Sequence, residues 1–251
     1  GFHGKTAGVM GLIGDESKHG WGPLPGGRFS VPYADCARCP FGLRYPDCSL
    51  ACADFARQAI KRTTSGAVAA VVIEPMQGTA GNVIPPPEFL PAIQGIAKEI
   101  GALLIADEMI TGFGRTGRWF GCNHSNVVPD IMCVGKALSG GYLTLAATLC
   151  TAEVASSIQG GALMHGPTFM ANPLACSIAL ASTGLLIESD WRGNLARIEG
   201  GLETGLEAAR DREGVSDVRV LGGIGVIQLD DPVDMEAATE AAVAHGVWLR
   251  P

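Results

Sequence analysis

The sequence predicts an α/β fold built on a mostly parallel sheet. Short apolar runs rich in β-branched residues alternate with amphipathic stretches of helical spacing, which is the pattern of strands that helices bury on both faces. Gly makes up 35 of the 251 residues, against an average share of about 7%, and this fits tight turns at strand ends. With 47% hydrophobic and 17% charged residues, the chain can bury a large core, as one domain or as one domain and part of another.

The first 50 residues are dense in Gly and Pro and predict mostly loop structure. A helix is then expected from Cys48 to about Arg62. The run Ala67–Ile73 is continuously apolar and is bounded by Glu74-Pro75, so we expect a buried parallel strand. The expected inner side of the helix consists of Leu50, Ala51, Phe55 and Ile60.

A β-α-β unit continues this pattern. Apolar residues at helical spacing run from Phe89 to Ile100, and Gly101 ends this helix. A second buried strand, Leu103–Ala106, completes the unit, for which a right-handed crossover is expected. Further strands are expected at Asp130–Val134 and Leu145–Leu149.

The remaining sequence predicts helices at 152–159, 172–188 and 192–211, the last with Leu195, Ile198, Leu202 and Leu206 on its inner face. Short apolar strands at 218–221 and 225–229 then alternate with a helix near 233–245. We therefore expect a large domain, residues 1–190, and an incomplete small domain, residues 191–251. Strand-like sequence continues to the last residue, and the chain opens directly with Gly1-Phe2-His3-Gly4, so we expect truncation at both ends. No signal peptide is recognised in the sequence.

Charge and hydropathy exclude two classes of partner. The net charge is −7 and no basic run could neutralise phosphates, which argues against nucleic acid. No apolar stretch of about 18 residues lacks helix breakers, so no membrane span is expected. We therefore expect a cytoplasmic protein whose ligands are small molecules.

Four of the eight cysteines cluster in one loop, at Cys36, Cys39, Cys48 and Cys52. Four thiolates at such spacing could form a tetrahedral zinc site. The alternative is a loop of ordinary free thiols in a reducing cytosol, and we favour this reading, so no metal is expected. The other cysteines lie in apolar or helical contexts, where a free thiol behaves as a small hydrophobic group.

Two polar side chains follow neighbouring strands of the predicted sheet. Asp107 ends the strand Leu103–Ala106, and Lys136 follows the strand that ends at Val134. Ligands of parallel sheets bind at the carboxyl ends of the strands, so both side chains should face one cleft. Such a pair suits pyridoxal 5′-phosphate (PLP), because a buried lysine amine forms a Schiff base and a carboxylate keeps the pyridine nitrogen protonated. On these two residues alone, the alternative of a solvated surface lysine and a helix-capping aspartate is favoured.

Three longer segments extend the pattern, Leu104–Gly117, Pro129–Lys136 and Ile73–Gly78. Together they resemble the class III aminotransferases, and the resemblance covers essentially the whole chain. It implies a fold-type I homodimer in which Lys136 is the Schiff-base lysine and Asp107 the partner of the ring nitrogen. Lys136 would then also shuttle a proton at the substrate carbon.

The segment Phe2-His3-Gly4 resembles the part of these enzymes whose aromatic residue stacks on the cofactor. The resemblance implies that Phe2 covers one face of the PLP ring and that His3 also belongs to the cofactor site. An ordinary core aromatic is the alternative for Phe2.

The C-terminal half is similar to one branch of the family, the 7,8-diaminopelargonic acid synthases, in the segments Val134–Thr148, Met164–Cys176 and Val247–Pro251. This implies that Thr168 and Pro167 reach the phosphate of the neighbouring subunit's PLP, and that Gly166 and Arg250 contact substrate. A helix-capping Thr168 and a surface Arg250 are the alternatives.

The first half departs from that branch. The segment Pro32–Cys48 resembles ω-aminotransferases, yet Thr79 stands where many of them carry a gating glutamate, and Ile110 where they carry Gln. The expected reaction is amino transfer from S-adenosylmethionine to 8-amino-7-oxononanoate in biotin biosynthesis. The alternatives are a broad ω-aminotransferase, acting on a diamine or ω-amino acid with a 2-oxo acid, or an inactive fragment of either. Because the N-terminal phosphate loop of the family is missing, we expect the chain alone to bind PLP poorly.

Overall fold

The computed structural model describes residues 1–12, 26–64 and 67–249. Four strands form the main sheet in the order β1-β2-β3-β4, and two more form a separate pair, β5-β6. The strands are β1 Ala70–Ile73, β2 Leu103–Asp107, β3 Ile131–Val134, β4 Ala147–Cys150, β5 Val215–Leu221 and β6 Ile224–Leu229. The α-helices are α1 Ala7–Met10, α2 Ala51–Thr63, α3 Phe89–Glu99, α4 Ala152–Ser156, α5 Pro173–Glu188, α6 Trp191–Leu206 and α7 Met235–Ala244.

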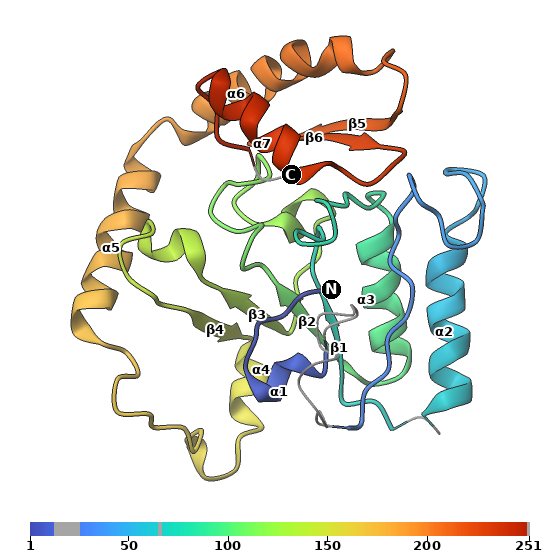
Figure 1. The fold of residues 1–251 in the computed structure, drawn as a ribbon. Coiled ribbons are helices and arrows are strands. Elements are labelled where there is room, and N and C mark those ends of the chain that lie inside the picture. The colour runs from blue at the N-terminus through green and yellow to red at the C-terminus, as the bar shows by residue number, and fades with distance from the viewer. Residues whose placement is uncertain (13–25, 65–66, 250–251) are drawn as a thin grey trace.

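The main sheet confirms the prediction of a mostly parallel arrangement. β1 pairs with β2 and β2 with β3 in parallel, whereas β4 runs antiparallel to β3. α3 connects β1 to β2 and packs on both β2 and α2. Figure 1 shows α2 and α3 next to the sheet, with β5, β6, α6 and α7 grouped together at the top of the view. The carboxyl ends of β1, β2 and β3 therefore share one edge of the sheet.

The core lies between this sheet and the helices α2 and α3. Phe89, Ile93 and Ile96 of α3 are almost completely buried, and they pack with Leu104 and Ala106 of β2. Alternate residues of a strand point to opposite faces, so Leu104 and Ala106 share one face. This packing fixes the face of β2 that meets α3 and with it the direction of the next residues, Asp107 and Glu108.

Two expected helix faces were correct only in part, because Ile60 of α2 and Leu202 and Leu206 of α6 face inward as expected but other residues do not. In α2 the residues buried against the core are Cys52, Ala53, Ala56 and Ile60, because small side chains allow α2 to approach α3 closely. Phe55 is 44% exposed and instead meets the Phe41 ring, with ring centroids 5.5 Å apart. Leu50 is not in the helix but precedes it in a left-handed conformation, with φ 56°.

In α6, Ile198 is 49% exposed rather than inward. Glu199 takes the inner position, since its carboxylate accepts the Gly222 N–H at 2.7 Å. Leu202 and Leu206 do approach the hairpin of β5 and β6, where a side chain on Gly225 would meet both of them. The expected domain boundary near residue 190 falls between α5 and α6 and stays a prediction. Within the described ranges, no helix is both long and apolar enough to cross a membrane.

Candidate active site

The centre of the candidate site is the pair of neighbouring strand ends that the sequence singles out. Asp107 is the last residue of β2, and its backbone pairs with Cys133 of β3. The Glu108 N–H continues this pairing by donating to the Cys133 carbonyl at 2.9 Å. Lys136 lies three residues after Cys133 and is the first residue of a short 3-10 helix, Lys136–Ser139, that follows β3. Asp107 and Lys136 therefore leave adjacent parallel strands at the same edge of the sheet.

Asp107 is held by contacts to both of its oxygens. His3 Nδ1 lies 2.8 Å from Oδ2, and the two side chains are only 9% and 11% exposed. The Met109 N–H donates to Oδ1 at 3.1 Å. Hydrogen bonds to both oxygens restrict the rotation of the carboxylate, so its orientation is set before any ligand binds.

The segment before His3 is fixed by a second carboxylate, at the end of β1. Glu74 is 4% exposed, and its Oε1 accepts the Phe2 N–H at 2.8 Å. Its other oxygen accepts the Gly78 N–H at 3.2 Å. The Tyr33 hydroxyl donates to the Glu74 carbonyl, and burial together with the nearby Glu74 charge raises the pKa of Tyr33 well above its usual value. Phe2, half-buried, is thereby placed at the same edge of the sheet as Asp107.

Lys136 occupies an unusual backbone conformation. Its φ is 47°, in the left-handed region that non-Gly residues rarely adopt. In the part of the chain that the structure describes, its amine has neither a hydrogen bond nor an ion pair. Strain of this kind costs about 1–3 kcal/mol and concentrates at functional sites. A strained lysine with an unpartnered amine at a strand end is therefore a functional candidate.

Gly135 allows the close approach of the two strand ends. A Cβ at this position would lie 2.5 Å from Cε of Met109 and 3.3 Å from the Leu145 carbonyl oxygen. Met109, two residues after Asp107, thus packs directly on the residue before Lys136. The absence of a side chain at Gly135 brings the Asp107 and Lys136 segments into contact.

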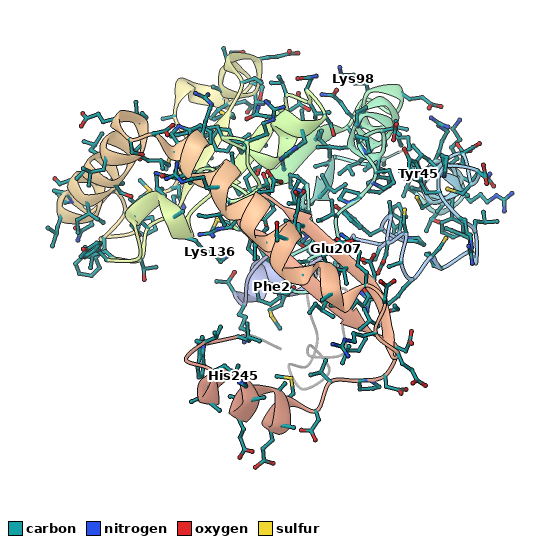
Figure 2. The ribbon with its side chains drawn as sticks, turned by 90° about the horizontal axis from the view of Figure 1, so that it is seen from above. Phe2, Tyr45, Lys98, Lys136, Glu207 and His245 are labelled. Atoms are coloured by element: carbon teal, nitrogen blue, oxygen red, sulfur yellow. The ribbon has the colours of Figure 1, made fainter. Side chains whose placement is uncertain are left out.

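Lys136 opens onto a cavity of about 690 Å³ between the main sheet and the β5-β6 hairpin. Figure 2 shows Lys136 and Phe2 in the middle of the molecule, away from Tyr45 and Lys98 on its other side. The cavity is large enough for a cofactor and a small substrate. Its lining consists of Asn82, Met109, Ile110, Arg115, Lys136, Ala137, Gly141, Gly223, Ile224 and Gly225.

Two loops form the wall of this cavity opposite Lys136. The Gly223 N–H of the β5-β6 turn donates to the Arg115 carbonyl at 3.0 Å. A Cβ on Gly222, whose φ is 57°, would lie 2.2 Å from the Gly117 nitrogen. Arg219 of β5 adds a hydrogen bond from Nε to the Asn82 carbonyl at 3.0 Å. The small hairpin is thus docked on the main sheet at the cavity itself.

Arg115 was not predicted as a site residue, although it lies in the segment Leu104–Gly117 that resembles the family. Its side chain lines the cavity, and in the part of the chain that the structure describes it has neither a hydrogen bond nor an ion pair. The signal was available, because a cation in a Gly-rich segment directly after a strand end is well placed to meet an anionic ligand. Asn82 was missed as well, since only the folded hairpin places it on the wall.

Several predicted residues lie apart from this cavity. Gly166, Pro167 and Thr168 are exposed, in the long connection between α4 and α5. Arg250 lies outside the described residues. Of the two departures from the ω-aminotransferases, Ile110 lines the cavity, whereas Thr79 is exposed in the loop that a bridge between Gln77 and Val83 closes. Gly78 packs against Ile110, where a Cβ would lie 2.2 Å from Cδ1.

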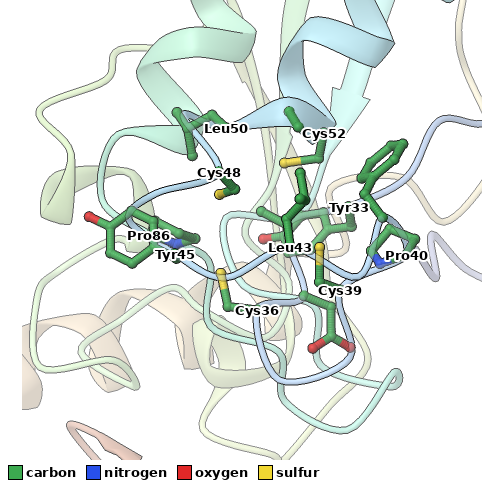
Figure 3. Close-up of a pocket in the computed structure, with 14 residues that line it drawn as sticks. Tyr33, Cys36, Cys39, Pro40, Leu43, Tyr45, Cys48, Leu50, Cys52 and Pro86 are labelled. Carbon is green, nitrogen blue, oxygen red and sulfur yellow. The ribbon is translucent and has the colours of Figure 1, made fainter.

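The clustered cysteines are free thiols around a small apolar pocket of about 20 Å³ (Figure 3). Burial, and then the neighbouring thiols, raise the pKa of Cys36, and burial also raises the pKa of Cys52. Thiols with raised pKa are protonated at neutral pH and are poor metal ligands. No three His, Cys, Asp or Glu side chains within the described ranges are placed to hold a metal ion. Tyr45 and Leu43 line the same pocket.

Comparison with known proteins shows the family to which the chain belongs. The family model for aminotransferase class-III matches residues 1–251. The adenosylmethionine-8-amino-7-oxononanoate aminotransferase of Mycobacterium leprae is 55% identical over 188 residues, covering 73% of this chain and 43% of that protein. The protein of the same name from Geobacter sulfurreducens is 35% identical over 269 residues, covering 100% of this chain and 59% of that protein. The chain thus spans about half the length of these relatives.

Solved structures give the same fold. A PLP-bound amine transaminase from an uncultivated Pseudomonas species aligns with a TM-score of 0.90 and 31% identity, covering 100% of this chain and 61% of that one. An (S)-enantioselective omega-transaminase from Thermomicrobium roseum aligns with a TM-score of 0.87 and 30% identity, covering 98% and 58%. These neighbours are fold-type I transaminases, so the fold expected from the sequence is confirmed.

The docking of the hairpin yields a stability prediction. Gly222→Ala introduces a side chain into the backbone of Thr116 and Gly117, and we expect a loss of at least about 3 kcal/mol in the free energy of unfolding. Gly214→Ala is the matched control, because Gly214 also has a positive φ but has open space around it. It should lose only about 1–2 kcal/mol. Urea denaturation measures both, and equal losses would contradict the close contact.

Proposed function

The chain belongs to the class III aminotransferases, and we propose that it carries out PLP-dependent amino transfer from S-adenosylmethionine to 8-amino-7-oxononanoate, a step in biotin biosynthesis. The observation that carries the proposal is the strained Lys136, which lines the cavity and follows the strand β3, next to the strand β2 that ends in the fixed carboxylate of Asp107. The names of the relatives from Mycobacterium leprae and Geobacter sulfurreducens support the choice of substrates.

The residues at the site fit the cofactor. Lys136 would bind its aldehyde carbon, and Asp107 would accept a hydrogen bond from its protonated ring nitrogen, with His3 holding the Asp107 carboxylate in place. Phe2, fixed by Glu74, would cover a face of the ring and exclude water. When bound, PLP acts as an electron sink that stabilises negative charge at the substrate carbon.

The protein's own groups have distinct tasks in such a reaction. The Lys136 amine is the base that holds or moves the proton at the reacting carbon. The guanidinium of Arg115, without a partner in the described part of the chain, offers a positive charge to a substrate carboxylate in the same cavity. We also assign Gly166 and Arg250 to substrate binding, and Pro167 and Thr168 to the cofactor phosphate, by the motifs they belong to.

A second candidate is a broad ω-aminotransferase that acts on a diamine or ω-amino acid with a 2-oxo acid. The apolar side chain of Ile110 on the cavity wall favours it, because an apolar wall accepts the alkyl chain of an amine. The structural neighbours named as amine and omega-transaminases support the same alternative.

We further propose that the protein acts in the cytoplasm as a homodimer, with Thr168 reaching the partner's site. The segment from Tyr142 to Ile187 exposes a series of large apolar side chains, and contiguous exposed apolar surface marks interaction sites. A second copy of the chain would cover it, and the eight free thiols fit a reducing compartment. The exposed side chains are Tyr142, Leu163, Met164, Phe169, Leu180 and Leu185, each at least 70% accessible.

The cofactor assignment predicts a spectroscopic result. Protein expressed from the complete gene and mixed with PLP should develop the visible absorbance band of a lysine-bound cofactor, and Lys136→Ala should lose it. Lys98→Ala, which removes an exposed lysine of α3, should keep the band. A flat spectrum for the unsubstituted protein would favour the inactive alternative.

The substrate assignment is tested by growth and by turnover. The complete gene should rescue a bacterial strain that lacks its own 8-amino-7-oxononanoate aminotransferase and therefore requires biotin. Lys136→Ala should reduce turnover by at least about 10³-fold, since it removes the nucleophile and the proton carrier together. Failure to rescue, combined with turnover of putrescine and pyruvate, would select the ω-aminotransferase instead.

The dimer assignment is tested by mixing variants. Thr168→Ala and Lys136→Ala proteins should each show low activity, and a mixed dimer should regain one complete site. Equal mixing then restores activity toward one quarter of the unsubstituted level, because half of the dimers are mixed and each has one site of two. Sedimentation gives the mass of the assembly, and an active monomer would contradict the proposal.

A further inference from the structure

Glu108 is a completely buried carboxylate that the chemistry described above does not use. It directly follows Asp107, and its relative exposure is 0%. In the part of the chain that the structure describes, it forms no ion pair with Lys, Arg or His. Burying a charged or polar group is costly unless hydrogen bonds replace its hydration. A buried carboxylate therefore marks a place where its acceptor oxygens are needed.

Those oxygens accept hydrogen bonds from several donors. The Gly121 N–H donates to Oε2 and the Cys122 N–H to Oε1, both at 2.8 Å. The Thr111 hydroxyl also donates to Oε2. Burial, and then contact with Glu108, raise the pKa of the Cys122 thiol far above its usual range, so the thiol keeps its proton for the same carboxylate. An ionised carboxylate offers about four acceptor sites, and here each has a donor.

These donors lie at the two ends of one loop, residues 109–120. Thr111 stands near its start, whereas Gly121 and Cys122 directly follow its end. Backbone contact strengthens the start, because the Gly112 N–H donates to the Glu108 carbonyl at 2.9 Å. The loop between contains Phe113 with φ 57° and Gly114 with φ 92°, a sharp and strained course. The Glu108 carboxylate therefore closes the base of the loop.

The same loop builds the wall of the Lys136 cavity, through Met109, Ile110 and Arg115. The tip of the loop has separate contacts of its own. His124 Nε2 lies 2.8 Å from the Thr116 carbonyl oxygen, and the Gly223 N–H donates to the Arg115 carbonyl at 3.0 Å. The position of the Ile110 and Arg115 side chains relative to Lys136 thus depends on how the loop is closed at its base.

We propose that Glu108 is a positioning residue, which fixes the loop 109–120 and so sets the distance of Ile110 and Arg115 from the Lys136 amine. The kinetic consequences rest on the function proposed above, whereas the placement of the loop does not. Glu108→Gln replaces one acceptor oxygen by an NH2 group, which at either position faces a backbone N–H, that of Gly121 or that of Cys122. Two donors cannot bond each other, so the base of the loop should open.

The loop carries its own reporter, which needs neither cofactor nor substrate. Trp119 packs against Trp191 of α6 with ring centroids 5.4 Å apart, and it also contacts Phe120. Near-ultraviolet circular dichroism of this pair is sensitive to the distance and angle between the rings. We expect Glu108→Gln to lose at least half of this signal while the far-ultraviolet spectrum is unchanged. Glu203→Gln, an exposed glutamate of α6, should alter neither spectrum.

Steady-state kinetics of the PLP-loaded protein provide the second readout. Glu108→Gln should raise KM for the carboxylate-bearing acceptor about tenfold or more, with a smaller change in kcat, because a displaced Arg115 weakens binding first. Thr111→Val should show a smaller change of the same kind, and Thr111→Ser, which keeps the hydroxyl, should restore KM. If Glu108→Gln does not fold, the comparison of Thr111→Val with Thr111→Ser tests the proposal in its place.

A matched core variant separates positioning from stability. Ile96→Val removes a buried methyl group of α3, outside the loop 109–120, and lowers the melting temperature. If Ile96→Val raises KM as much as the Glu108 and Thr111 variants do at equal stability, the role of Glu108 is merely structural and the proposal is wrong. It is equally wrong if Glu108→Gln leaves both the Trp119 signal and KM unchanged. If the unsubstituted protein neither binds PLP nor turns over, the proposed function fails, and the Trp119 signal alone decides on Glu108.

Discussion

The parallel pairing of β2 with β3 is the constraint on which the candidate site depends. Its register places Asp107 opposite Cys133, and the Glu108 N–H extends the ladder by one more bond. Lys136 lies two residues after the end of β3. The Asp107 carboxylate and the Lys136 amine therefore belong to neighbouring strands and leave the sheet at the same edge. Antiparallel pairing would have sent them to opposite ends. The connection from β2 to β3, residues 108–130 with the short 3-10 helix Gly121–His124, makes the parallel course possible by returning the chain to the starting edge.

Two glycines allow close approaches around this edge of the sheet. Gly135 lets Met109 lie against the residue before Lys136, and Gly222 lets the β5-β6 turn touch the backbone of Gly117. Side chains at either position would separate the surfaces that meet there. The cavity is therefore a consequence of two close approaches, each possible only because a Cβ is missing. At Gly135 and Gly222, two of the many glycines of the chain have a specific structural role.

Much of this arrangement follows from local sequence. Continuous apolar runs identified β1, β2 and β3, since strands buried on both faces need no alternation. The strand ends then identified Asp107 and Lys136 as neighbours. The helix faces were less certain, because Phe55 and Ile198 match an apolar stripe but packing prefers small residues in α2 and the Glu199 bond in α6. Asn82 could not be found, because its place on the cavity wall exists only when a distant hairpin docks, whereas Arg115 could have been noticed as a cation in the Gly-rich segment after β2.

Consecutive carboxylates at the end of β2 illustrate how one strand can serve two purposes. Successive side chains of a strand point to opposite faces, so Asp107 and Glu108 cannot share an environment. Asp107 meets His3 at the edge of the sheet, where 11% of its side chain stays exposed. Glu108 turns into the core, where backbone N–H groups saturate it and water is excluded. Asp and Glu thus have similar chemistry here but separate tasks, and the pleat of the strand, rather than either residue type, assigns the tasks.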